Sequence, residues 1–157
     1  MQNRQRIGSA RNAALIAALA ATAVSAPLQA EPSGADVTVS VTNLRNSDGV
    51  LRACMTRDED RFPRCQNSEQ GYRVVVPAGE GAVLRFRNVT PGTYAIALLH
   101  DENDNGRADR ALGMMPTEGF GFSRDARVRM GPPDFDDAAV TIGENATRLT
   151  IRMRYML

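Results

Sequence analysis

Several short segments of this chain repeat apolar residues at every second position. In residues 37–42 valine alternates with threonine and serine, and in residues 147–155 leucine, isoleucine, methionine and tyrosine alternate with polar residues. A period of two places the apolar side chains on one face of a strand, whereas no segment after residue 30 has the spacing of an amphipathic helix. The sequence therefore predicts seven strands, at residues 37–42, 50–55, 72–76, 82–86, 93–99, 138–142 and 147–155.

These strands predict an all-β fold, an antiparallel seven-stranded β-sandwich formed by a single domain over residues 31–157. The turn cluster Asn-Ser-Asp-Gly at 46–49 joins the first two strands, which we expect to form a hairpin. Residues 93–99 are almost continuously apolar, which indicates a central strand covered on both faces. A chain of 157 residues is long enough for one such domain with a substantial core.

Residues 1–30 have the composition of a secretory signal peptide. Three arginines precede an apolar stretch, residues 13–24, and a small residue, Ala30, stands at the expected cleavage position. The stretch is too short to span a bilayer comfortably, so an uncleaved anchor is the less favoured alternative. Cleavage after Ala26 is disfavoured because Pro27 would follow the cut. We expect a periplasmic or secreted protein, cleaved after Ala30, with no membrane span in the mature chain.

The charge balance does not suggest a nucleic-acid partner. All 19 basic residues are arginine, and three of them precede the expected cleavage site. The mature chain then has 16 arginines against 18 acidic residues, a net charge of −2. Nucleic-acid binding would need a clustered basic excess, and base stacking would need more aromatic residues.

The two cysteines, Cys54 and Cys65, both lie in the expected mature domain. An even number of cysteines in an exported protein indicates a disulfide. The residues between them are mostly polar, as in a loop, and closing this loop would stabilise the fold by about 3 kcal/mol. A metal-binding or redox pair is less favoured because the spacing is wide and no histidine lies near.

The sharpest chemical pattern follows the expected central strand, in residues 101–109. Oxygen-bearing side chains recur at every second position, and a glycine stands where a loop around a cation must turn sharply. By comparison with a calcium-binding EF-hand loop, the ligands would be the side chains of Asp101, Asn103, Asn105 and Asp109, with the carbonyl oxygen of Arg107. The sequence thus predicts a Ca²⁺ site.

This loop departs from the EF-hand pattern at its last ligand. Leu112 stands at position 12, where a bidentate glutamate is expected, and no flanking helices are predicted. Glu118, or an acid from residues 134–137, could supply the missing oxygen. We expect weak affinity, with a dissociation constant of about 10⁻⁴–10⁻³ M. The alternative is a metal-free loop held by Asx turns, in which Asp and Asn side chains cap their own backbone.

Residues 101–137 contain no convincing strand or helix pattern, and so long a connection is more often functional than structural. We expect a surface here for a small ligand or an envelope protein. Its candidate residues are His100, Phe120, Phe122, Ser123, Asp134 and Phe135. For the phenylalanines at 120 and 122, packing beneath the loop is the favoured alternative.

The expected function is therefore a non-enzymatic binding or accessory module, with no catalytic residue assigned. The alternative is a metal-dependent hydrolase that uses His100 with Asp101 and Glu118. A lone histidine makes a poor zinc set, and we expect its ring to bond a loop carbonyl instead. Ser123 lies outside any Gly-x-Ser-x-Gly motif, which disfavours a serine hydrolase.

Four motifs in order resemble those of the DUF2141 family: Pro-Gly-Thr-Tyr-Ala-Ile at 91–96, His-Asp-Glu-Asn-Asp-Asn-Gly at 100–106, Pro-Thr-Glu-Gly-Phe-Gly-Phe-Ser at 116–123 and Gly-Pro-Pro-Asp-Phe-Asp-Asp-Ala at 131–138. The resemblance covers essentially the whole mature chain. It implies an exported bacterial protein of the Gram-negative envelope. It also implies an Ig-like or transthyretin-like (prealbumin-like) sandwich, similar to carboxypeptidase-regulatory-like modules. It implies no activity and no catalytic residues.

Overall fold

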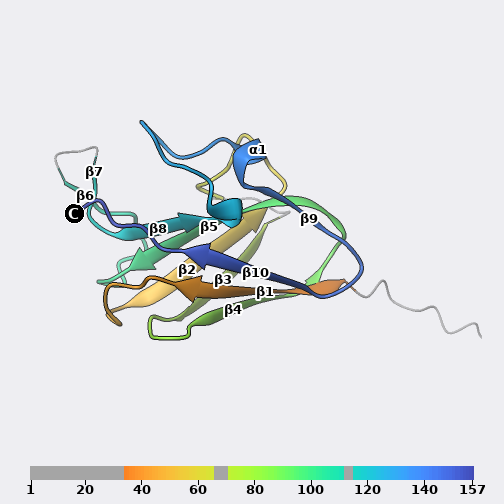
Figure 1. Cartoon of the computed structure of the whole chain (residues 1–157), viewed down its shortest axis with the longest axis horizontal. Helices are drawn as coiled ribbons and strands as arrows, with labels where there is room; N and C mark the ends of the chain where they lie inside the picture. Colours follow the sequence, from red (N-terminus) through yellow and green to blue (C-terminus); the bar gives the residue numbers. More distant parts are fainter. Residues whose placement is uncertain (1–33, 66–70, 112–114) are drawn as a thin grey trace, which may run out of the picture. The chain divides into compact units, whose positions relative to one another are not determined.

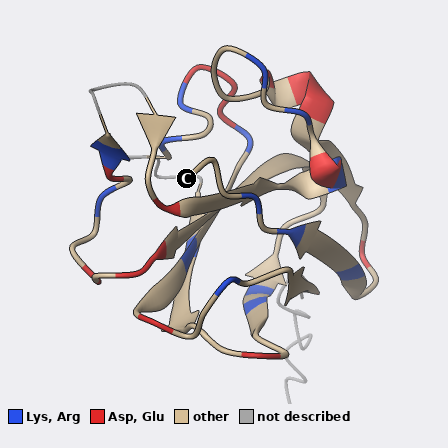
Figure 2. Ribbon diagram, turned by 60° about the vertical axis from the view of Figure 1, so that its left-hand side comes forward, with Lys and Arg blue, Asp and Glu red and all other residues tan. Residues whose placement is uncertain are grey.

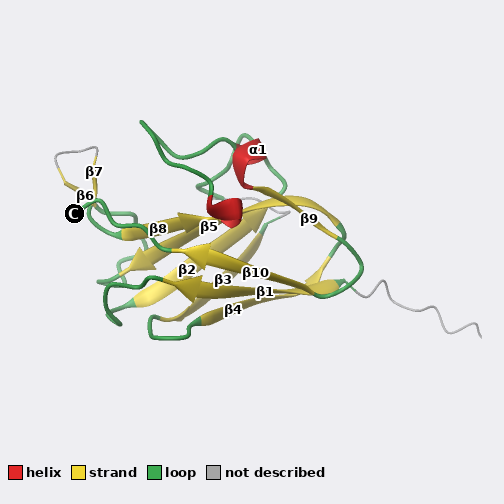
Figure 3. Cartoon of the chain, in the orientation of Figure 1, coloured by secondary structure: helices red, strands yellow, loops and turns green. Residues whose placement is uncertain are grey.

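The computed structural model describes residues 34–65, 71–111 and 115–157, and this part of the chain is all-β (Figure 1). Two open sheets account for most of it, and two short helical turns lie on the same side of the larger sheet (Figure 3). No helix in the described residues is long and apolar enough to cross a membrane. The expected signal peptide, residues 1–30, lies outside the described residues.

The smaller sheet has the strand order β10-β1-β4, and the larger one has the order β3-β2-β5-β8. Strand β9 also pairs with β5, along the half of β5 that β8 leaves open, so β8 and β9 share one edge of β5. A two-stranded ribbon, β6-β7, stands apart from both sheets. The strands are β1 (Ala35–Thr42), β2 (Val50–Thr56), β3 (Tyr72–Pro77), β4 (Val83–Val89), β5 (Gly92–Asp101), β6 (Arg110–Ala111), β7 (Met115–Pro116), β8 (Gly119–Phe122), β9 (Ala139–Ile142) and β10 (Thr147–Arg152); the helical turns are η1 (Ser123–Asp125) and α1 (Phe135–Ala138).

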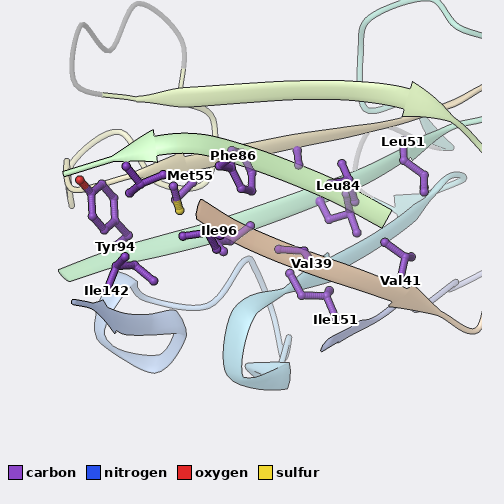
Figure 4. Packing of buried hydrophobic residues seen from close by; sticks show 14 of the residues in the cluster. Val39, Val41, Leu51, Met55, Leu84, Phe86, Tyr94, Ile96, Ile142 and Ile151 are labelled. Carbon is purple, nitrogen blue, oxygen red and sulfur yellow. The ribbon is translucent and has the colours of Figure 1, made fainter. Parts of the chain in front are cut away.

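The hydrophobic core lies between the two sheets (Figure 4). The valines of β1 that alternate in the sequence all point inward, whereas Thr38 and Thr42 do not enter the core. These valines pack with residues of β4 and β10 from their own sheet and with residues of β2 and β5 from the other sheet. The core includes Val37, Val39, Val41, Leu51, Met55, Leu84, Phe86, Ile96, Ile151 and Met153.

Strand β5 is central, as its continuous hydrophobicity predicts. It pairs with β2 on one edge and with β8 and β9 on the other. Its inner face carries Tyr94, Ile96 and Leu98 into the main core. Its outer face carries Ala95 into a second cluster, formed with Phe122, Ala126, Phe135 and Ala138. Both faces are therefore covered.

The pairing of the strands differs from the expectation in two ways. Strands β1 and β2 do not form a hairpin, because β1 pairs with β4 and β10 while β2 pairs with β3 and β5. The sheets are also not wholly antiparallel, since β1 and β10 run parallel, with Val39 opposite Leu149 and Val41 opposite Ile151. Alternation in the sequence fixes the face that a side chain takes, but neither the partner strand nor its direction.

The region after β5 also contains strands that were not predicted. Short strands β6, β7 and β8 lie within residues 101–137, for which the sequence predicts none. The count of seven is therefore wrong for the described residues. Strand β8 runs beside β5 with Phe120 opposite Leu99. Its four residues, Gly-Phe-Gly-Phe, form too short and too glycine-rich a run to be recognised as a strand from the sequence.

Cys54 and Cys65 form the predicted disulfide, with their Cα atoms 6.2 Å apart. The loop that the disulfide closes carries Phe62 over the outer face of the larger sheet. There the Phe62 ring meets the rings of Phe122 and Phe135 edge to face, at centroid distances of 5.8 and 6.1 Å. The disulfide thus holds the loop that carries Phe62 against the second apolar cluster.

Candidate functional site

The acidic loop, residues 101–109, begins at the end of strand β5 in the larger sheet. Asp101 is the last residue of β5, and its side chain is fully buried. Its Oδ1 accepts a hydrogen bond from the backbone N–H of Asn105 at 3.0 Å, and its Oδ2 accepts one from Gly106 at 2.8 Å. Arg52 of β2 donates to the same Oδ2 through Nε at 2.5 Å. The carboxylate therefore holds the first turn of the loop against the sheet.

These contacts set the charge state of Asp101. Burial alone would raise the pKa of this carboxyl, and burial is the largest single influence. The Arg52 guanidinium and the N–H groups of Gly106 and Asn105 together outweigh it, so the pKa lies below its usual range. Arg52 also reaches Asp104 through Nη2 at 2.5 Å. One arginine thus bridges two acids of the loop.

The predicted Asx turns are present in the loop. Asn103 Oδ1 accepts from Asn105 N–H at 3.1 Å, and Asn105 Oδ1 accepts from Arg107 N–H at 2.8 Å. Both asparagine amides donate to Asp109 Oδ2, at 2.8 and 2.7 Å. The backbone is left-handed at Asp104 and Gly106, with φ values of 53° and 78°. The side chains of Asn103, Asn105 and Asp109 are therefore linked by hydrogen bonds, and both asparagines also cap their own backbone.

Glu118, the predicted substitute ligand, closes this loop from the next segment of the chain. Its Oε1 accepts from Glu102 N–H at 3.2 Å, and its Oε2 accepts from Asp109 N–H at 3.1 Å. The side chain is nearly buried, and burial raises the pKa of the carboxyl. One carboxylate therefore joins the two ends of the loop. Leu112, at the position of the missing EF-hand ligand, lies outside the described residues.

The donor set fits a hard cation better than a transition metal. Asn103 and Asn105 each use one lone pair of the amide oxygen in an Asx turn, and each oxygen has a second. Asp101 Oδ1 accepts a single hydrogen bond from the described residues. In the described part of the chain, no three side chains of His, Cys, Asp or Glu are grouped as for a metal. Amide and carbonyl oxygens would therefore have to complete a cation site.

His100 lies at the end of β5 and is completely buried. Its Nε2 donates to the Asp48 carbonyl oxygen at 2.8 Å, and its Nδ1 accepts from the Tyr155 hydroxyl at 2.8 Å. Because a carbonyl oxygen can only accept, these partners fix the proton on Nε2. The expected bond to a loop carbonyl is thus confirmed. Both ring nitrogens are occupied, which leaves neither for a metal or a substrate proton.

Four of the six residues expected on a ligand surface are buried instead: His100, Phe122, Ser123 and Phe135. The Ser123 hydroxyl accepts from Ile96 N–H at 2.9 Å and donates to the Ala138 carbonyl oxygen at 2.5 Å. It therefore joins β5, η1 and α1, and it is not an exposed nucleophile. Phe120 is half-buried and Asp134 is exposed.

Sequence reasoning did not identify Arg45 and Tyr155, which fix the far side of the loop. Arg45 binds both carboxylate oxygens of Glu102, at 2.8 and 2.5 Å, and lowers the pKa of that carboxyl. It also donates to the Thr117 carbonyl oxygen at 2.9 Å and lies over the Tyr155 ring, 4.6 Å from its centroid. An arginine in a turn and a tyrosine in an alternating strand give no such signal in the sequence.

A comparison with family models matches residues 39–150 to the family described as "Uncharacterized protein conserved in bacteria (DUF2141)". The chain belongs to the DUF2141 family. The match runs from β1 into β10, so the DUF2141 region contains both sheets, the acidic loop and its Glu118 closure. Comparisons with curated proteins and with solved structures gave no match.

Proposed function

We propose that this DUF2141 protein is an exported, non-enzymatic binding or accessory module whose loop at 101–109 takes Ca²⁺. In this proposal residues 1–30 are a signal peptide, and the mature protein works in the periplasm or outside the cell. The Cys54–Cys65 disulfide supports an oxidising compartment. Amino-terminal sequencing of the exported protein tests this part: a first residue other than Glu31 would contradict cleavage after Ala30.

We further propose that the two sheets form a sandwich of the Ig-like or transthyretin-like type. The core shared by β1, β4 and β10 with β2 and β5 supports two sheets packed face to face. In such a scaffold the loops at the ends of the strands are positioned by a rigid framework. Binding residues occur disproportionately on loops of this kind.

The observation that carries the calcium proposal is the closure of the loop on buried Glu118. Asp101, Asn103, Asn105 and Asp109 are held in one compact turn, and Glu118 ties its two ends. These are oxygen donors of the kind that Ca²⁺ prefers. Arg52 and Arg45 pair with the acids at 101, 102 and 104. Asp109 and Glu118 are then the acids at the loop that have no ion-pair partner among the described residues. A divalent cation would offset their charge.

Calcium would complete the loop without dismantling its hydrogen bonds. In this proposal the second lone pairs of the amide oxygens and the Arg107 carbonyl oxygen would bind the cation, while Asp101 stays bonded to the backbone. Arg52 competes for Asp101, which fits the weak affinity expected from the sequence. The hydrolase is not proposed, because His100 uses both ring nitrogens and Ser123 is buried.

Thermal melting of the full chain in millimolar CaCl₂ tests the cation site. With a dissociation constant of about 0.5 mM, 10 mM Ca²⁺ should stabilise the fold by about 2 kcal/mol, or a few degrees in Tm. Ca²⁺ should raise Tm more than Mg²⁺ does, and a chelator should reverse the shift. Asp109→Asn should remove most of it, whereas Glu144→Gln, in an exposed turn, should keep it. Equal Tm values with Ca²⁺ and with chelator would refute the site.

A further inference from the structure

A hollow of about 500 Å³ lies on the surface away from the acidic loop, within residues 124–137. This segment runs from η1 to α1, on the outer side of the larger sheet (Figure 3). Both acidic and basic residues occur around α1 (Figure 2). A hollow of this size suits a small ligand, since small-molecule sites occupy roughly 300–1,000 Å³.

One wall of the hollow is held in a strained conformation. Arg124 and Asp125 are successive non-glycine residues with left-handed backbone, at φ values of 56° and 53°. Such a conformation is costly and persists only where the surroundings enforce it. Arg154 enforces it here by donating to the carbonyl oxygens of Asp125 and Ala126, each at 2.8 Å. The preceding residue, buried Ser123, is fixed by its hydroxyl bonds to Ile96 and Ala138.

The opposite wall is also fixed from below. Pro133 and Phe135 are buried, and the Phe135 ring packs against Phe62 of the disulfide-closed loop. Arg124 reaches across the hollow to the Asp136 carbonyl oxygen at 3.1 Å. The two walls are thus tied to each other and to the second apolar cluster. The frame is therefore ordered before any ligand arrives, which lowers the entropic cost of binding.

The charged side chains that line the hollow do not pair with one another. Arg127, Arg129, Asp134 and Asp137 all line it and are exposed. Among the described residues, none of these four side chains forms an ion pair or a hydrogen bond. The arginines at 45, 52 and 154, by contrast, each bind a carboxylate. Two cations and two anions therefore face one hollow with their bonding capacity unused.

We propose that this hollow binds a short zwitterionic ligand of the peptide class, with a free carboxylate and a free ammonium. The planar guanidinium groups of Arg127 and Arg129 suit the carboxylate, which they can bind in a bidentate manner. Asp134 and Asp137 suit the ammonium. A simple anion would satisfy the arginines and leave the aspartates to repel it. The proposal gives a ligand class to the binding role proposed above, and it does not require the calcium site.

Calorimetric titration of the full chain with trialanine tests the proposal, with N-acetyl-trialanine and trialanine amide as matched probes. Each capped peptide lacks one of the two charges. Because a hydrogen bond to a charged group is worth about tenfold or more in affinity, each capped probe should bind at least about tenfold more weakly than trialanine. The titration is run in chelator, so failure of the calcium site does not affect it.

Single variants then test which side chain binds each charged end of the peptide. Arg129→Gln should weaken trialanine about tenfold but leave trialanine amide unchanged, and Asp134→Asn should weaken trialanine but leave N-acetyl-trialanine unchanged. Arg148→Gln and Glu144→Gln change exposed charges away from the hollow and should alter nothing. The proposal is overturned if trialanine does not bind, if capping has no effect, or if inorganic phosphate binds as tightly as the peptide. The calcium melting experiment is independent of all three results.

Discussion

Asp101 and Glu118 show how two carboxyl groups that bind one loop acquire pKa shifts in opposite directions. Both are buried, and burial favours the neutral form of each. Asp101 also has Arg52 and two backbone N–H groups, so its pKa falls. Glu118 has two backbone N–H groups but no cation bonded to it in the described residues, and burial together with the repulsion of Asp101 and Asp109 raises its pKa. The arginine beside Asp101 and the acids beside Glu118 together account for the opposite shifts.

The Asp101 contribution to stability should therefore disappear in acid. A carboxyl whose folded-state pKa is lowered stabilises the fold above its unfolded pKa, about 3.9, and loses this contribution as pH falls through the folded pKa. Arg52→Gln should cost about 1–3 kcal/mol in urea unfolding at pH 7 because it removes a charged partner from a buried carboxylate. That cost should shrink as the pH falls below about 4.

The raised pKa of Glu118 acts in the opposite direction. Its contribution is largest at low pH and falls as pH rises through its folded pKa. For this reason the free energies of unfolding of wild type and Arg52→Gln are compared at each pH, so that the contribution of Glu118, present in both, cancels. Arg148→Gln, an exposed change on β10, serves as the control and should cost little at any pH. A cost for Arg52→Gln that is constant from pH 7 to pH 3 would contradict the assignment.

At the scale of elements, β8 depends on glycine for its close approach to the C-terminal segment, residues 151–155. A Cβ at Gly121 would lie 2.6 Å from Ile151 Cγ2 and 3.0 Å from the Arg152 carbonyl oxygen. At Gly119 it would lie 2.3 Å from Tyr155 Cε1. The neighbouring Phe120 meanwhile exchanges backbone hydrogen bonds with Arg154, at 3.0 and 2.8 Å. These bonds join the edge of one sheet to the end of the other.

Gly121→Ala should therefore destabilise the fold by about 1–3 kcal/mol, the usual cost of overpacking a filled site. Gly79→Ala is a matched control, because a Cβ there meets no atom within 4 Å. This control should be neutral or slightly stabilising, since alanine restricts the unfolded chain. Urea unfolding measures both. Equal stability of the two variants would show that β8 can move away from β10 without cost.

These elements show what the sequence could and could not predict. Valine alternation placed the β1 side chains correctly, and the apolar run of 93–99 identified β5 as central, because burial pattern is a local property. The parallel partner of β1 was missed, since pairing depends on the rest of the chain. Strand β8 was missed because it is only four residues long and half of them are glycines, which are unfavourable in strands.

The same distinction applies to the candidate site. The oxygen spacing from Asp101 to Asp109 could be read from residue type and order, and the role of Glu118 as a metal ligand stays a prediction. That Glu118 binds two backbone N–H groups of the loop was not predicted. Arg52 and Arg45 were not predicted either, because an arginine on a strand or in a turn is usually solvated. Their roles arise only when the fold brings them to the loop. The residues of the hollow were missed for the same reason, apart from Asp134, a candidate ligand-surface residue, and Asp137, which was named only as an acid.

At the scale of the whole molecule, the two sheets share one core, and the acidic loop continues directly from its central strand β5. Strand β5 runs the length of that core, with Tyr94 near its first end and His100 near its last. At the first end Tyr94 meets Tyr72, with ring centroids 6.0 Å apart. At the other end His100 meets Tyr155, also at 6.0 Å. All three tyrosines of the chain thus report on the two ends of one strand.

This arrangement predicts that the ends unfold together. The core residues of both sheets contact across the layer between them, so neither sheet can keep its apolar face buried alone. Tyr155→Phe leaves tyrosine fluorescence only at the first end, and the double variant Tyr72→Phe, Tyr94→Phe leaves it only at the other. In each variant the urea midpoint by fluorescence should equal the midpoint by far-UV circular dichroism. Each variant is compared with itself, so any loss of stability from the substitution cancels.

A lower fluorescence midpoint in the variant that retains Tyr155 would mean that the acidic loop and the C-terminal segment unfold before the sheets. The loop would then need its ligand to be ordered, rather than being ordered by Arg52, Arg45 and Glu118.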